Sequence, residues 1–167
     1  MIYRAIGLCT LPNNTTITFA EFHENAGEWT YGLKASSVFT GENLHSGKLI
    51  NQFIEENRLQ YQVALVSVYH NAGSELQSGA VIAAETGLPV ITSFSETDIA
   101  LGGNGDFFSF IAAKLKIESK KPGAINMALC VAFMGVLRWR EEFNFLSSFT
   151  GARRNSIGGA VWIGDQA

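Results

Sequence analysis

Val63-Ala64-Leu65-Val66-Ser67-Val68 is a continuous apolar, largely β-branched run near the middle of the chain, and it decides the fold class. A strand that is hydrophobic at almost every position suits a sheet covered on both faces. A short helix is predicted next over residues 78–86, because Gly87 stands where helices commonly end. A further strand is predicted over residues 88–91. A strand, helix, strand order implies parallel strands joined by a right-handed crossover.

The N-terminal part of the sequence predicts three antiparallel strands, over residues 2–8, 16–22 and 28–38. Asn13-Asn14 and residues 25–27 supply the turn signals between them. Near-alternation of apolar and polar residues over 16–22 predicts a strand with one face in solvent. In the third strand, Trp29, Tyr31 and Leu33 share one face.

Three more segments have a helical pattern. Residues 43–57 place Leu49, Ile50, Phe53 and Ile54 on one face, residues 107–115 predict a short helix, and residues 124–137 are almost entirely apolar. The last segment is too short to cross a bilayer, which takes about 20 residues, so we expect a buried helix. Residues 158–163 suit either a loop or an added strand.

The order of these elements predicts one α/β domain over residues 1–167, with a mixed five-stranded sheet and helices. Three antiparallel strands followed by two parallel ones is the ribonuclease-H-like order, and it is also the core of each half of actin-like ATPases.

Composition narrows the functional classes. The net charge is −3, and the only basic doublets are Lys120-Lys121 and Arg153-Arg154. A nucleic-acid binder is expected to carry a basic stripe, so charge argues against a nucleic-acid partner. The two cysteines lie in apolar runs and the three histidines lack ligand spacing, which predicts reduced, packed thiols and no zinc site. With no signal-peptide pattern at the N-terminus, we expect a cytoplasmic protein without membrane contact.

Several stretches resemble the anhydro-N-acetylmuramic acid kinase family. Residues 83–91 read A-A-E-T-G-L-P-V-I, and Phe94 and Asp98-Ile99-Ala100-Leu101-Gly102-Gly103-Asn104-Gly105 follow. This order is similar to the family signature A-x-x-T-G-L-P-V-V-x-D-F-R-x-x-D-x-A-x-G-G-Q-G. The opening strand is also similar to the family, as are three later stretches, at residues 132–138, 144–152 and 158–159.

The resemblance implies the first domain of a two-domain sugar kinase, together with the C-terminal helix that returns to it. Such kinases hold ATP and Mg²⁺ between their domains, but the phosphate-binding turn is degenerate here. The aligned run, Cys9 to Thr18, has no glycine, and Pro12 removes a backbone donor. We therefore expect no cofactor.

The resemblance also supplies the candidate site residues. Asp98 is the remaining carboxylate in the segment that carries the family's general base, and the alternative is a loop or helix-capping aspartate. Gly102, Gly103, Asn104 and Gly105 are the best-preserved motif and would contact substrate, or they serve the backbone turn alone.

These observations favour a non-catalytic relative of the kinase that binds a small sugar or pairs with another protein. The alternative is an active kinase or amino-sugar-processing subunit completed by a partner chain. A homodimer is expected, through a face including Phe107, Phe108, Phe110 and Trp162, and a full-length kinase paralogue is a second possible partner. A ribonuclease-H-like nuclease needs several carboxylates on and near its first strand, and residues 2–8 have none.

Overall fold

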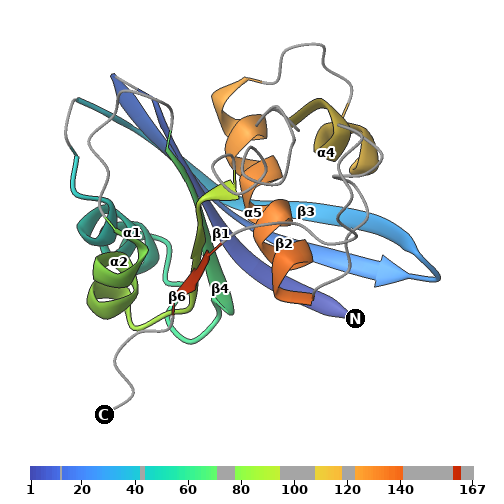
Figure 1. Ribbon diagram of the computed structural model, residues 1–167, viewed down its shortest axis with the longest axis horizontal. Coiled ribbons are helices and arrows are strands. Elements are labelled where there is room, and N and C mark those ends of the chain that lie inside the picture. The colour runs from blue at the N-terminus through green and yellow to red at the C-terminus, as the bar shows by residue number, and fades with distance from the viewer. Residues whose placement is uncertain are drawn as a thin grey trace.

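The computed structural model describes residues 1–11, 13–41, 44–70, 78–94, 108–117, 123–140 and 160–162. It shows one mixed sheet with helices on both faces (Figure 1). The strands are β1 (Ile2–Leu11), β2 (Asn14–Asn25), β3 (Glu28–Thr40), β4 (Leu65–His70), β5 (Val90–Thr92) and β6 (Ala160–Trp162). The helices are α1 (Ser46–Glu56), α2 (Gly79–Thr86), α4 (Phe108–Lys114) and α5 (Ala124–Arg140).

The sheet has six strands in the order β3-β2-β1-β4-β5-β6, one more than the five expected. The antiparallel β1–β2–β3 meander and the parallel pairing of β4 with β1 and β5 are as predicted. The extra strand is β6, which pairs antiparallel with β5 and settles the open choice for the tail. The α/β class with a mixed sheet is therefore confirmed, and only the strand count changes.

Alternation along β1 sends its side chains to two separate helical layers. Ile6 and Leu8 join a core with α1 and α2, whereas Ala5 and Cys9 pack beneath α5. Both faces of β2 are also buried over most of its length, so the expected solvent face is wrong. The reason is that α5 covers Thr16 and Thr18, which a one-sided pattern had assigned to water.

The three apolar side chains that were expected to share one face of the edge strand β3 differ in their burial. Trp29 is buried, but Tyr31 and Leu33 are exposed. The contacts of α5 with the sheet are made mainly to β1, β2 and β4, so most of β3 lies beyond its cover.

Helix α2 begins and ends on local signals that are visible in the sequence. The Ser78 hydroxyl accepts a hydrogen bond from the backbone N–H of Val81, which caps the first turn. Gly87 has a φ of 70°, the left-handed conformation that ends many helices. These caps explain why the predicted boundaries of this helix agree with the structure.

Helix α5 crosses the central strands at unusually close range. A Cβ atom built on Gly7 would overlap the backbone carbonyl of Ala128 and lie 2.7 Å from the backbone nitrogen of Ala132. A Cβ atom on Gly135 would lie 2.8 Å from the Ser67 hydroxyl oxygen. The helix and the sheet therefore meet backbone to backbone at Gly7, and at Gly135 the helix backbone lies against the Ser67 side chain. A Cβ atom at either position would force the helix and the sheet apart.

An aromatic cluster holds the C-terminal half of α5 against β2 and β3. The Phe133 ring lies 5.3 Å from that of Phe22 and 5.0 Å from that of Trp29, between centroids. The Arg140 guanidinium lies 5.2 Å from the Tyr3 ring and 5.3 Å from the Trp29 ring. These contacts confirm that α5 is a buried helix. Within the described residues, no helix combines the length and the apolar character needed to cross a bilayer.

Replacing Gly7 by alanine should lower the free energy of unfolding by at least about 2 kcal/mol, because α5 must move away from β1. Chemical denaturation measures the change. The control is Gly32→Ala in β3, where the new Cβ would lie 3.6 Å from the Lys34 Cε, an ordinary contact. Equal stability of the two variants would contradict the close packing of α5.

Replacing Phe133 by alanine should cost about 3–5 kcal/mol, the usual range for removing a fully buried aromatic ring. Trp139→Ala on the same helix is the control, because 44% of Trp139 is exposed. It should cost less than about 1 kcal/mol. A denaturation midpoint for Phe133→Ala that equals the wild-type value would mean that the ring is not packed as described.

Candidate functional site at the carboxyl edge of the sheet

The carboxyl ends of the parallel strands β1 and β4 lie together at one edge of the sheet. Ligands of open α/β sheets generally bind outside this edge. β1 ends at Leu11, beside Asn14 at the start of β2, and β4 ends at His70, beside Thr10. We refer to these ends of β1, β2 and β4, with the start of α5, as the carboxyl edge.

Buried hydroxyl groups lead from the centre of the sheet to the carboxyl edge. The side-chain oxygens of Thr16, Thr18 and Ser67 are buried without a hydrogen-bond partner among the described residues, and so is the Oδ1 atom of Asn14. The register places Thr18 and Ser67 on either side of Gly7, directly beneath α5. Unpaired buried polar groups cost stability, so this line of hydroxyls is a feature that packing alone does not explain.

The N-terminus of α5 opens onto the same edge. The carbonyl of Gly123 accepts the first helical hydrogen bond, from the N–H of Met127, at 2.9 Å. Gly123 is exposed, and among the described residues nothing lies within 4 Å of the place that its Cβ would take. The first turn of α5 carries no acidic residue. The N–H groups of the first turn and the positive end of the helix dipole therefore favour an anion.

Apolar contacts fix the helix N-terminus against the strands. Leu11 and Met127 pack on the cluster of Cys9, Ala128 and Val131. Since Leu11 is also the register partner of Asn14, the Asn14 amide and the first turn of α5 belong to one small region. The Tyr69 ring closes the β4 side, with its centroid 5.0 Å from that of Phe108.

Most of the site residues assigned from the sequence lie outside the part of the chain that the structure describes. Asp98 and Gly102, Gly103, Asn104 and Gly105 lie outside the described residues, so their roles stay predictions. His70 is half-buried at the end of β4, which extends beyond the apolar run that ends at Val68. Phe108, expected on an open face, is half-buried against Tyr69. The positions of the Phe107, Phe110 and Trp162 side chains also lie outside the description.

The central strands bring no acidic cluster to the edge. None of the ten residues of β1 or the six of β4 is aspartate or glutamate. Across the part of the chain that the structure describes, no three His, Cys, Asp or Glu side chains group as metal ligands. Two-metal hydrolysis depends on carboxylates that clamp both ions, so the described strands offer donors for an anion and none for a metal pair.

Comparison with known structures identifies the architecture. Thermus thermophilus RuvC matches with a TM-score of 0.54 and 16% identity, over 84% of this chain and 96% of the RuvC chain. The chain has the fold of RuvC. T. thermophilus RuvC in complex with a Holliday junction substrate matches with a TM-score of 0.50 and 15% identity, over 83% and 95% of the two chains. No protein-family model matches the sequence, and no curated protein matches it.

These findings correct the resemblance to anhydro-N-acetylmuramic acid kinase. The matching structures are RuvC, a ribonuclease-H-like protein, and no family model supports the kinase. The motif at residues 83–91 is accounted for by local structure, since it contains the end of α2, its left-handed Gly87 and the start of β5. The sugar ligand, the kinase paralogue and the role in amino-sugar metabolism that depended on that resemblance are withdrawn with it.

The exclusion of nucleic acid as a partner is also wrong. It rested on net charge and on the lack of a basic stripe, whereas a protein of the same fold is seen with a Holliday junction substrate. Phosphates are held by backbone N–H groups, hydroxyls and amides as well as by basic side chains. An acidic chain can therefore have a local phosphate site.

The thiols of Cys9 in β1 and Cys130 in α5 are packed groups, as the sequence predicted. Cys9 and Cys130 are both buried and unpaired. Burial raises the pKa of Cys9 to about 12, and burial, with a smaller effect of Cys9, raises the pKa of Cys130 to about 12. Neither thiol supplies a nucleophile at neutral pH, because the thiolate is the reactive form.

Both thiols should resist iodoacetamide at pH 8 in the folded protein and react in denaturant, as followed by mass spectrometry. Their raised pKa values mean that thiolate formation favours the unfolded chain. Their contribution to stability is therefore complete below the ordinary thiol pKa of 9.0 and declines as the pH rises above it. Rapid labelling of the folded protein would show that the contact of α5 with β1 opens readily.

Proposed function

We propose that this chain is a nucleic-acid-binding domain that holds a phosphate of branched DNA at the carboxyl edge and does not cleave the DNA. The observation that carries the proposal is the N-terminus of α5, which begins at the exposed Gly123 and is near the Thr10 hydroxyl, where β1 ends and β2 begins; that hydroxyl is unpaired among the described residues. The likeness to RuvC supplies the type of ligand, and it does so through the fold alone.

Binding would use neutral donors. The first N–H groups of α5 and the Asn14 amide can reach phosphate oxygens, and contacts of this kind set the position of a protein on DNA without reading its sequence. Few counterions are released when phosphates are bound by neutral groups, so the affinity should depend only weakly on salt. This agrees with a pI of about 5.6 and no basic stripe.

Cleavage is not proposed because a ribonuclease-H-like nuclease needs carboxylates on and near its first strand, and neither β1 nor the neighbouring β4 has an aspartate or a glutamate. A role for Asp98 as a base and the expectation that the chain binds no cofactor both stay predictions, and neither enters the proposed binding. A cytoplasmic location also stays a prediction.

Fluorescence anisotropy with a labelled four-way DNA junction tests the proposal. We expect binding with a Kd of about 1–100 μM, tighter than for a linear duplex of the same sequence. Affinity should fall less than about tenfold between 50 and 200 mM salt. The junction should remain intact in Mg²⁺ or Mn²⁺. Absence of binding at 100 μM protein would contradict the proposed DNA binding. Metal-dependent cleavage of the junction would contradict the proposal that the chain does not cleave DNA.

Two substitutions at one position separate phosphate binding from helix stability. Aspartate and serine are both good N-caps, so Gly123→Asp and Gly123→Ser should leave α5 at least as stable. Only the aspartate places a negative charge where the phosphate is expected. Gly123→Asp should therefore weaken junction binding about tenfold or more, and Gly123→Ser should weaken it much less. Equal affinities for the two variants would exclude the N-terminus of α5 as the phosphate site.

A further inference from the structure

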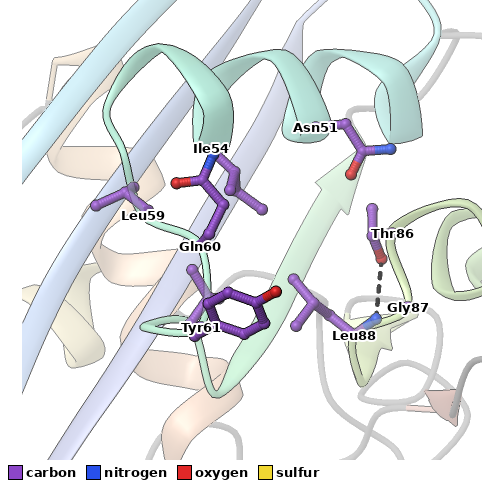
Figure 2. A pocket seen from close by; sticks show the side chains of 9 residues that line it. Asn51, Ile54, Leu59, Gln60, Tyr61, Thr86, Gly87 and Leu88 are labelled. Atoms are coloured by element: carbon purple, nitrogen blue, oxygen red, sulfur yellow. Dashed lines mark hydrogen bonds between the residues drawn. The ribbon is translucent and has the colours of Figure 1, made fainter.

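A pocket of about 370 Å³ lies at the opposite end of the sheet, where β4 and β5 begin (Figure 2). It is formed by α1, the connection over residues 57–64 and the residues that end and follow α2. Its volume is within the range of small-molecule sites. Because it is at the amino ends of the parallel strands, it is separate from the carboxyl edge.

The floor of the pocket is apolar and belongs to the core. Leu59 is buried, and Ile54, Val63 and Leu88 pack against the same cluster between the sheet, α1 and α2. No residue that lines the pocket is charged. A charged group would lose its hydration here without gaining a partner, so the lining favours a neutral ligand.

Tyr61 lies on the rim of the pocket, and its backbone has a conformation that is unfavourable for a residue with a side chain. The N–H of Gln62 donates to the carbonyl of Leu59 at 3.0 Å, which makes residues 59–62 a tight turn. Tyr61 is the third residue of this turn and has a φ of 66°, where glycine or asparagine is usual. Its ring is completely exposed, so burial does not offset the strain. A strained and unburied aromatic side chain beside a pocket points to a contact with a ligand.

Two amides complete the set of recognition groups. The Asn51 Nδ2 donates to the carbonyl of Glu85 at 3.0 Å, which fixes the side chain and leaves its Oδ1 as an acceptor. Gln60 lies beside the same space, and the ring of Tyr61 and the side chain of Leu88 lie across from each other (Figure 2). Amide side chains pair with the donor and acceptor atoms of adenine, and aromatic rings stack on bases.

We propose that this pocket binds an unpaired adenine base, which stacks on Tyr61, contacts the apolar floor and pairs with the Asn51 and Gln60 amides. The site does not depend on the phosphate site of the carboxyl edge. An adenine nucleoside would occupy it whether or not the chain binds branched DNA.

Titration with adenosine, followed by ¹H–¹⁵N NMR, tests the proposal, with uridine as the comparison ligand. We expect saturable shifts in residues 59–61 and 86–88, a Kd of about 1 mM or lower, and weaker binding of uridine. Tyr61→Gly should weaken adenosine binding about tenfold or more through loss of stacking. Its melting temperature should be unchanged or higher, because glycine adopts a positive φ without strain.

Arg58→Gly is the matched control. Arg58 also has a positive φ, of 54°, at the end of α1, but it does not line the pocket. The Arg58→Gly variant should have a stability like that of Tyr61→Gly, and it should bind adenosine with the affinity of the wild type. Absence of saturable shifts, equal affinity for uridine, or equal adenosine affinity of the two glycine variants would each overturn the proposal. Junction binding is measured separately, so failure at one site is distinguishable from failure at the other.

Discussion

The contact between α5 and β1 at Gly7 is the constraint on which the rest of the structure depends. Because Gly7 has no side chain, the backbone of α5 at Ala128 and Ala132 lies directly on the central strand. This fixes the height and direction of the helix over the sheet. The aromatic cluster around Phe133 then fixes its C-terminal half, and the start of the helix comes to the carboxyl ends of the strands.

The same close packing explains why the site holds hydroxyls and helix amides. Thr18, Gly7 and Ser67 form one row beneath α5, where long side chains have no room. Beneath α5, the polar groups of the described strands are therefore small hydroxyl side chains. The likeness to RuvC concerns the architecture alone.

Local signals in the sequence were enough for much of the fold. The apolar run over 124–137, the capped helix α2 and the β-branched strand β4 each have a pattern that favours one structure. Burial of Thr16 and Thr18 could not be predicted, because threonine suits either face of a strand and the covering helix is more than 100 residues away in sequence. The short strand β6 likewise depends on pairing with β5.

The function was harder to predict than the fold, since the prediction relied on short motifs and on the net charge of the whole chain. A helix end followed by Gly87 and a strand is a common structural unit, and it led to the wrong family. Net charge is an average over the whole chain and cannot reveal a local anion site of the kind proposed here, which is formed by backbone groups. Hydrogen–deuterium exchange with and without a four-way junction tests the central claim most directly. Protection should be concentrated in the first turn of α5 and at residues 10–16. Protection confined to α1 and residues 57–64, or none, would contradict binding at the carboxyl edge.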